Sequence, residues 1–169
     1  MQDLFSIKGK TALVTGGSRG IGEMIAGGFL ASGARVYISS RKVEACDAAA
    51  ERLMKTFGGK CISLPGNVAE LDGISALVET LSGQEDKLDI LVNNAGVGWG
   101  APLEEFPEIG WDKVMDTNVK GAFFLIQQLL PLLKASGSAE DPARVINIGS
   151  IDGIVTPTFD NISYGPSKA

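Results

Sequence analysis

Short apolar runs alternate with helix-forming stretches along almost the whole chain, and this alternation constrains the fold more than any other feature. The apolar runs cover residues 11–15, 35–39, 61–64, 88–92 and 144–148. The helix-forming stretches run from about Ile21 to Gly33 and cover 43–57, about 71–81 and about 111–133. Strands that are apolar on both faces are typical of a parallel sheet covered by helices on both sides. We therefore predict an α/β fold, a Rossmann-type doubly wound parallel sheet in one domain over residues 1–169.

Composition and charge exclude several classes of function. The net charge is −5, without a cluster of Lys and Arg, so we expect no nucleic-acid partner. The chain has no histidine, which rules out a Ser-His-Asp triad, a Cys-His pair and a His-ligated metal site, and we expect no bound metal. Cys46 and Cys61 are too far apart for a CxxC motif and are expected to be buried and reduced. Neither a leader peptide nor a membrane-spanning run is visible, so we expect a cytoplasmic protein without a membrane partner.

A glycine-rich segment, TGGSRGIG over residues 15–22, follows the first predicted strand and opens the first predicted helix. Gly16 permits a sharp turn, Gly20 permits the backbone to approach a pyrophosphate, and Gly22 permits the helix to pack close to the sheet. The helix N-terminus then presents free N–H groups and the positive end of its dipole to the phosphates. The segment therefore predicts a dinucleotide site, the alternative being a purely structural turn.

The second predicted strand ends in Ser39-Ser40-Arg41 and carries no acidic residue there. A site for NAD places Asp or Glu at this point to hold the ribose hydroxyls, and such a carboxylate would repel a 2′-phosphate. Arginine instead binds phosphate through charge-assisted hydrogen bonds, so Arg41, with Arg19 nearby, predicts NADP (NADPH) as cofactor. The alternative is that Arg41 is a solvated residue at the start of a helix.

The TGxxxGxG spacing, together with Asn93-Asn94-Ala95-Gly96 after the fourth predicted strand, resembles the short-chain dehydrogenase/reductase family. The resemblance implies that Gly16, Ser18, Arg19 and Ile21 line the cofactor diphosphate and ribose. It implies that Asn67 and Val68 stand at the end of the third strand where the family usually carries Asp, with Asn67 as an acceptor for the adenine amino group. It also implies that Asn94 and its neighbours join the loops beside the cofactor. The full predicted cofactor-binding set is Gly16, Ser18, Arg19, Gly20, Ile21, Gly22, Arg41, Asn67, Val68, Asn94, Ala95 and Gly96.

Tyr164 and Lys168 are four residues apart, which places both side chains on one face of a helix. Tyrosines have a reference pKa of about 10, so acid/base work near neutrality needs a nearby cation. An ammonium about 4 Å away contributes about 4 kcal/mol at an effective dielectric of about 20, which is the right size. A Tyr four residues before a Lys is also common on ordinary helices, and a Ser after a strand, such as Ser150, is usually a helix cap.

The family resemblance assigns roles to these residues and adds Asn118 to them. It implies hydride transfer from NADPH to a ketone, with Tyr164 protonating the carbonyl oxygen and Ser150 donating a hydrogen bond to the same oxygen. Lys168 would favour the ionised form of Tyr164 and hold the nicotinamide ribose, and Asn118 would support a water relay to Lys168.

Within the family, the chain resembles 3-oxoacyl-acyl-carrier-protein reductases, and residues 98–100, 127–134 and 142–150 resemble those linked to rhamnolipid and polyhydroxyalkanoate precursors. This implies a 3-oxoacyl thioester or a similar small-molecule ketone as substrate, and a homodimer or homotetramer at full length. Trp99 either lines an acyl site or anchors its loop by packing.

The chain stops one residue after Lys168. We therefore expect a fragment, truncated after the start of the catalytic helix, in which the C-terminal part of the family fold is missing and the last strand is an exposed edge. The alternatives to a reductase are a truncated NADP-binding module without catalytic activity and an alcohol dehydrogenase of the same family that works toward oxidation.

Overall fold

The computed structural model of the protein describes residues 5–155 and 160–169. The prediction that the chain carries no leader peptide concerns its N-terminal residues. Residues 1–4 of that stretch lie outside the described residues. The strands are β1 (Thr11–Thr15), β2 (Arg35–Ser39), β3 (Lys60–Ser63), β4 (Ile90–Asn93) and β5 (Arg144–Asn147). The helices are α1 (Gly20–Ala31), α2 (Val43–Phe57), α3 (Leu71–Ser82), α4 (Glu108–Met115), α5 (Gly121–Ser136) and α6 (Tyr164–Lys168). The described residues also form three short helical turns, which are η1 (Leu103–Glu105), η2 (Asp116–Lys120) and η3 (Ile151–Gly153).

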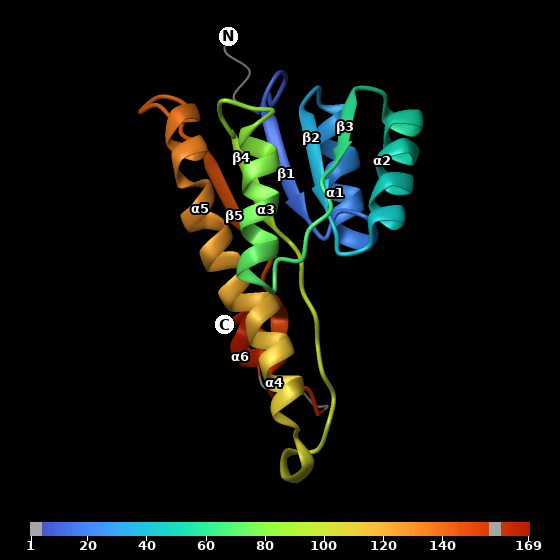
Figure 1. The fold of residues 1–169 in the computed structure, drawn as a ribbon, viewed down its shortest axis with the longest axis vertical. Helices are drawn as coiled ribbons and strands as arrows, with labels where there is room; N and C mark the ends of the chain where they lie inside the picture. The colour runs from blue at the N-terminus through green and yellow to red at the C-terminus, as the bar shows by residue number, and fades with distance from the viewer. Residues whose placement is uncertain (1–4, 156–159) are drawn as a thin grey trace.

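The strands form one parallel sheet in the order β3-β2-β1-β4-β5 (Figure 1). The strand order reverses between β1 and β4, and in sheets of this kind ligands bind outside the carboxyl ends of the strands at such a point. The predicted Rossmann-type fold is therefore confirmed, with strand ends that differ from the predicted ones by two residues or fewer.

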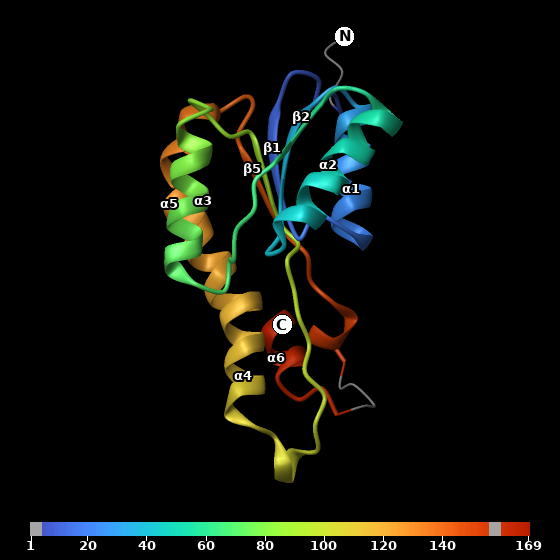
Figure 2. The same ribbon diagram turned by 45° about the vertical axis from the view of Figure 1, so that its right-hand side comes forward.

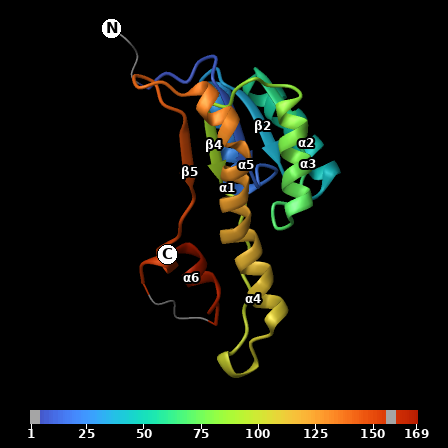
Figure 3. The ribbon, with the colours of Figure 1, turned by 60° about the vertical axis from the view of Figure 1, so that its left-hand side comes forward.

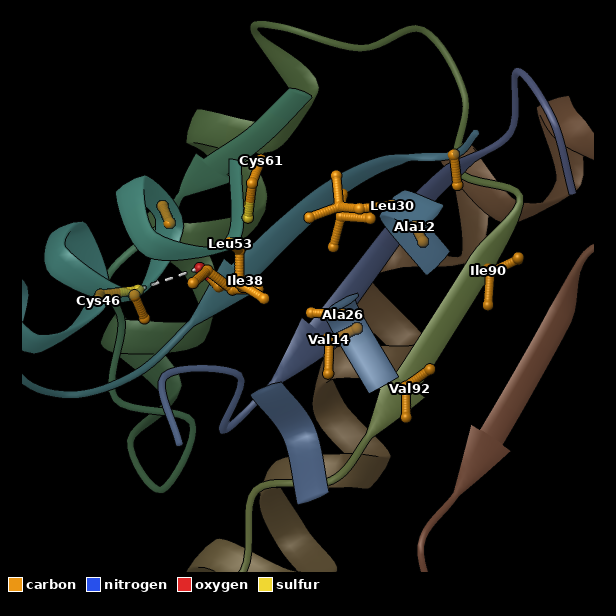
Figure 4. Close-up of a cluster of buried hydrophobic side chains, with 14 residues drawn as sticks. Ala12, Val14, Ala26, Leu30, Ile38, Cys46, Leu53, Cys61, Ile90 and Val92 are labelled. Carbon is orange, nitrogen blue, oxygen red and sulfur yellow. Dashed lines mark hydrogen bonds between the residues drawn. The ribbon is translucent and has the colours of Figure 1, made fainter. Parts of the chain in front are cut away.

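Helices cover both faces of the sheet, with α1 and α2 on one side and α3 and α5 on the other (Figure 2). Strand β1 shows why its sequence is apolar throughout: Ala12 and Val14 pack into the α1–α2 side, and Leu13 packs into the α3–α5 side. Figure 4 shows the first of these clusters, which includes both cysteines. Both are free and buried, as predicted; burial raises the pKa of Cys61 to about 12, and the Cys46 thiol donates to the carbonyl oxygen of Ile38.

Strand β5 forms one edge of the sheet (Figure 3). Val145 and Ile146 are 41% and 42% exposed, although β1 and β4 are buried at every residue. Adjacent residues of a strand point to opposite faces, so both faces of β5 are partly uncovered. The expected exposed apolar edge is present.

The long helix predicted over 111–133 is longer and less regular than expected. It begins at Glu108, directly after Pro107, and extends to Ser136, and its middle turn, η2, has π-helical hydrogen bonding. Such turns within α-helices are frequent at functional sites. Helix α4 reaches beyond the sheet, where α6 lies beside it (Figures 1 and 2). Among the described residues, no helix combines the length and the apolar character needed to cross a membrane.

Candidate active site

The glycine-rich loop lies at the carboxyl end of β1. Gly16 and Gly20 have φ angles of +66° and +57°, a conformation that favours glycine. A Cβ atom at Gly20 would meet no other atom within 4 Å, so the space in front of this turn is open. The side chain of Arg19, at the N-cap of α1, makes no capping hydrogen bond, which leaves the first N–H groups of the helix available to an anion.

Asn94, after β4, joins this loop to the neighbouring strand. Its side-chain amide donates to the carbonyl oxygens of Thr15 and Gly16, at 2.9 and 3.3 Å. The Thr15 hydroxyl accepts from the backbone N–H groups of Asn94 and Ala95, both at 3.0 Å. A Cβ on Gly22 would overlap the Gly16 carbonyl and the Asn94 amide, so the close helix packing predicted for Gly22 is present. Thr15 was not among the predicted site residues, although it opens the glycine motif.

Two exposed arginines stand at the rim of this loop. Arg19 directly precedes α1, and Arg41 follows β2 by two residues. The backbone N–H of Gly17 donates to the carbonyl oxygen of Ser39 at 3.1 Å, which holds the glycine loop against the end of β2. Ser18 is half-buried and Ile21 is exposed on the first turn of α1. This edge of the sheet therefore carries positive charge next to free helix N–H groups.

Asn67 and Val68 differ from the expectation, because β3 ends at Ser63 and both residues lie in the loop that precedes α3. The Asn67 amide donates to Glu70 at 2.7 Å, and its oxygen accepts from the N–H of Ala69 at 3.3 Å, as in a local turn. Val68 is 8% exposed and packs in the cluster below α3 and α5. The Val68 side chain is therefore part of the core, so only its backbone groups could contact a ligand.

Asn118, Lys168 and Gly96 meet at the carboxyl end of β4. The Asn118 side chain accepts from the N–H of Val97 and donates to its carbonyl oxygen, both at 2.9 Å, and also donates to the Ser167 hydroxyl at 2.8 Å. A Cβ on Gly96 would stand 3.3 Å from the Lys168 ammonium and 3.6 Å from the Asn118 oxygen. The π turn η2 thus places Asn118 between the β4–α4 loop and α6.

Lys168 and Tyr164 share one face of α6, as the spacing predicted. The Lys168 ammonium donates to the carbonyl oxygen of Ile148 at 2.9 Å and lies 5.9 Å from the centre of the Tyr164 ring. Burial lowers the pKa of Lys168. Both side chains are half-buried, so a substrate can reach Tyr164. Ser167 and the Ile148 carbonyl were not predicted, because their contacts join segments far apart in the sequence.

Ser150 follows β5 and begins η3, where its hydroxyl accepts from the N–H of Asp152 at 3.2 Å. It is therefore a cap, as the alternative interpretation held, and it also lies on the segment that follows the Ile148 carbonyl bound by Lys168. A hydroxyl that accepts one hydrogen bond keeps its own proton to donate. The two interpretations of Ser150 are compatible.

Trp99 follows the packing interpretation. A Cβ on Gly110 of α4 would lie 2.7 Å from three atoms of the indole ring, and the Lys113 ammonium is 5.2 Å from the ring centre. The indole thus anchors the β4–α4 loop to α4. Gly98, one residue earlier, lies against the Tyr164 ring, since a Cβ there would be 3.9 Å from it.

The geometry brings the glycine-rich loop and the residues Ser150, Tyr164, Lys168 and Asn118 to the carboxyl edge of the sheet. A family model described as short chain dehydrogenase matches residues 10–169. The chain belongs to this family. As a short-chain dehydrogenase, it is 53% identical over all 169 residues to the rhamnolipids biosynthesis 3-oxoacyl-[acyl-carrier-protein] reductase of Pseudomonas aeruginosa.

Solved structures show the same similarity. The Pseudomonas aeruginosa RhlG/NADP active-site complex superimposes with a TM-score of 0.94 at 53% identity over 99% of this chain. L-sorbose reductase from Gluconobacter frateurii, complexed with NADPH and L-sorbose, has a TM-score of 0.89 at 32% identity over 96% of this chain. This short-chain dehydrogenase spans 65% of the length of the Pseudomonas aeruginosa reductase and 60% of the length of L-sorbose reductase.

Proposed function

We propose that the protein is an NADPH-dependent oxidoreductase that reduces a ketone, a 3-oxoacyl thioester, to the hydroxy product. The observation that carries the proposal is the meeting of Lys168 and Asn118 beside Gly96, with the Tyr164 ring against Gly98. The same segment after β4 is joined to the glycine loop through Asn94. In this proposal residues 1–169 form a single nucleotide-binding domain that also holds the catalytic set.

The residues at the carboxyl ends of β1 and β2 fit a dinucleotide with a 2′-phosphate. The open space at Gly20 and the free N–H groups of α1 suit the diphosphate. Exposed Arg41 and Arg19 suit the 2′-phosphate, and no acidic residue ends β2. The relative solved with NADP and the reductase solved with NADPH support this assignment. When bound, NADPH supplies the hydride that reduces the ketone carbon.

Two side chains, Tyr164 and Ser150, act on the carbonyl oxygen of the substrate in this proposal, and Lys168 and Asn118 support them. Tyr164 donates its proton to the oxygen as negative charge develops there. The Ser150 hydroxyl donates a hydrogen bond to the same oxygen and contributes most in the transition state. Lys168 stabilises the tyrosinate that remains, and its hydrogen bond to Ile148 holds it in place. Asn118, bound to Val97 and Ser167, holds the loop and helix together beside the lysine.

The proposed substrate class rests on the 53% identical relative, whose name specifies a 3-oxoacyl-[acyl-carrier-protein] reductase. We also infer a cytoplasmic homodimer or homotetramer at full length. An apolar surface is exposed along α4, η2 and α5, which supports self-association; it is formed by Ile109, Val119, Phe123 and Leu130.

Tyr164→Phe tests the catalytic assignment directly. Because only the acidic hydroxyl is removed, turnover of a 3-oxoacyl thioester should fall by about 10²- to 10⁴-fold, while NADPH affinity stays unchanged. Turnover is followed by NADPH absorbance in the full-length protein, and binding by NADPH fluorescence. Tyr37→Phe, at a buried position away from the site, is the matched control and should keep its turnover.

The same assay separates the alternatives. A wild-type protein that binds NADPH but reduces no ketone would be a binding module. One that only oxidises an alcohol with NADP⁺ would be a dehydrogenase working in the opposite direction. Loss of NADPH binding in Tyr164→Phe would contradict the role of this residue.

A further inference from the structure

Ser150 and Tyr164 come from two segments that are joined by a continuous path of hydrogen bonds. The Ser150 hydroxyl accepts from the backbone N–H of Asp152 at 3.2 Å. The Asp152 carboxylate accepts from the side-chain amide of Asn161 at 3.1 Å. The backbone carbonyl oxygen of Asn161 accepts from the backbone N–H of Tyr164 at 2.8 Å. The two residues proposed to act on one substrate oxygen are thus connected through Asp152 and Asn161.

The central bond of this path is built into the protein rather than formed on its surface. Asn161 is 8% exposed and Asp152 is half-buried. A carboxylate only accepts hydrogen bonds, so it fixes which end of the Asn161 amide faces it. A hydrogen bond to an ionised acceptor is also stronger than one between neutral groups.

The backbones on either side of this bond are tightly packed. A Cβ on Gly153, the last residue of η3, would overlap the carbonyl group of Lys168 in α6. A Cβ on Gly149 would lie 3.9 Å from the backbone carbonyl oxygen of Lys168. The turn that carries Ser150 therefore rests directly on the helix that carries Tyr164, and small shifts at Asp152 or Asn161 would move one against the other.

We propose that Asp152 and Asn161 are positioning residues that set the place of the Ser150 hydroxyl relative to Tyr164. Neither is proposed to touch the substrate or the cofactor. This inference rests on the proposed function, because the separation of Ser150 and Tyr164 matters for rate only if both act on one oxygen. A misplacement of about 1 Å at a reacting group can cost about 100-fold in rate.

A double-mutant cycle that exchanges the carboxylate and the amide of Asp152 and Asn161 tests the pair in the full-length protein. Asn161→Asp sets two carboxylates against each other and should lower kcat by about 10- to 100-fold, with KM for NADPH unchanged. Asp152→Ala removes the acceptor and should have a similar effect. Asp152→Asn keeps an acceptor oxygen for Asn161 and should stay within about 3-fold of the wild type. The double variant Asp152→Asn with Asn161→Asp again pairs an amide with a carboxylate and should recover most of the kcat lost in Asn161→Asp.

Asp160→Ala is the matched control, because Asp160 is exposed and adjacent to Asn161, and its described contact, with Ala101, uses its backbone oxygen. It should leave kcat unchanged. Equal kcat values for Asn161→Asp and the double variant would show that the lost rate does not come from this pair, and would overturn the inference.

A second measurement does not depend on turnover. With 3-fluorotyrosine incorporated, the ¹⁹F resonance that disappears in Tyr164→Phe belongs to Tyr164. This resonance should shift or broaden in Asp152→Ala and Asn161→Asp, return toward its original position in the double variant, and stay in place in Asp160→Ala. An unmoved resonance in both single variants would overturn the inference, even in an active enzyme. A resonance that moves as expected in a protein without reductase activity would instead contradict the proposed function and leave the positioning role supported.

Discussion

At the scale of single residues, the candidate site contains two cations, Arg41 and Lys168, in different surroundings. Arg41 is exposed after β2 and is available to a solvent-facing phosphate. Lys168 is half-buried, and burial lowers its pKa, so its ammonium depends on the Ile148 carbonyl for support. A substitution at Arg41 should therefore change which cofactor binds, whereas one at Lys168 should change catalysis as well.

Arg41→Asp should reverse or remove the preference for NADPH over NADH. The substitution replaces the proposed phosphate ligand with a carboxylate that repels phosphate and can accept from ribose hydroxyls. Hydrogen bonds to charged groups are worth about 1.5–3 kcal/mol, so the ratio of the two dissociation constants should change by at least about 10-fold. Fluorescence titration with each cofactor measures this ratio.

Lys42→Asp is the control for Arg41→Asp, since it makes the same change in charge at the next exposed position. It should leave the ratio nearly unchanged. An equal loss of NADPH preference in both variants would point to the overall charge of the surface rather than to a contact by Arg41.

At the scale of elements, the glycine loop depends on how closely α1 approaches β4. Gly22 and Gly28 both lie in α1, where alanine has the higher helix propensity. They differ in surroundings, because a Cβ at Gly22 would overlap the Gly16 carbonyl and the Asn94 amide, whereas one at Gly28 would meet nothing within 4 Å. The pair therefore separates helix propensity from tertiary packing.

Gly22→Ala should lower the free energy of unfolding by about 1–3 kcal/mol, because the added methyl group overpacks a backbone contact. It should also weaken NADPH binding, since the glycine loop must shift. Gly28→Ala should raise the free energy of unfolding by up to about 1 kcal/mol and leave binding intact. Urea unfolding and NADPH titration of both variants check this, and a stabilised Gly22→Ala would contradict the contact.

At the scale of the whole molecule, a buried tyrosine makes stability depend on pH. The Tyr37 hydroxyl donates to Glu85 at 2.7 Å, and Arg35 pairs with the same carboxylate at 2.7 Å. Burial, followed by the hydrogen bond to Glu85, raises the pKa of Tyr37 to about 12. Burial by itself would raise the pKa of Glu85, but the hydrogen bonds from Arg35 and Tyr37 outweigh it and lower that pKa. The network joins β2 to the segment after α3.

The stabilisation from Tyr37 should be fully present below pH 10, the ordinary pKa of the unfolded side chain, and should be lost as pH rises toward 12. A difference of about two pKa units corresponds to a loss of up to about 3 kcal/mol. Tyr37→Phe should be less stable at neutral pH by about 1 kcal/mol and should show a weaker decline in stability above pH 10. Urea unfolding between pH 8 and pH 11.5 measures both; parallel declines in the two proteins would contradict the assignment.

The sequence allowed much of the fold to be predicted, because its signals are local. The apolar run at 11–15 and the glycines at 16, 20 and 22 each reflect a requirement of neighbouring backbone, and the structure places β1, a turn with positive φ and α1 accordingly. The helix at 43–57 was equally clear, because a glycine follows its last residue. In the structure this residue, Gly58, ends the helix with a φ of +71°. The family resemblance added the proposed catalytic set, because periodicity alone does not distinguish Tyr164 and Lys168 from an ordinary helix face.

Sequence reasoning failed at features that hydrophobic periodicity and motif spacing do not report. The π turn at 116–120 was not predicted, because a shift from α- to π-helical hydrogen bonding changes no periodicity over so few residues. Asn67 was placed at a strand end, yet its side chain forms a turn with Ala69 and Glu70. Trp99 had two interpretations until Gly110 was found beneath its ring.

Hydrophobic periodicity, turn chemistry and helix geometry act over a few residues. The sequence was therefore sufficient to predict the layers of the short-chain dehydrogenase fold, the glycine loop and the helical pair Tyr164–Lys168. The contacts of Asn118 with Ser167, of Lys168 with Ile148 and of Asp152 with Asn161 became visible only in the folded protein. The physical reason is that a buried polar group takes whichever partner the packed elements bring within hydrogen-bonding distance, and that partner is chosen by the whole fold rather than by its neighbours in the chain.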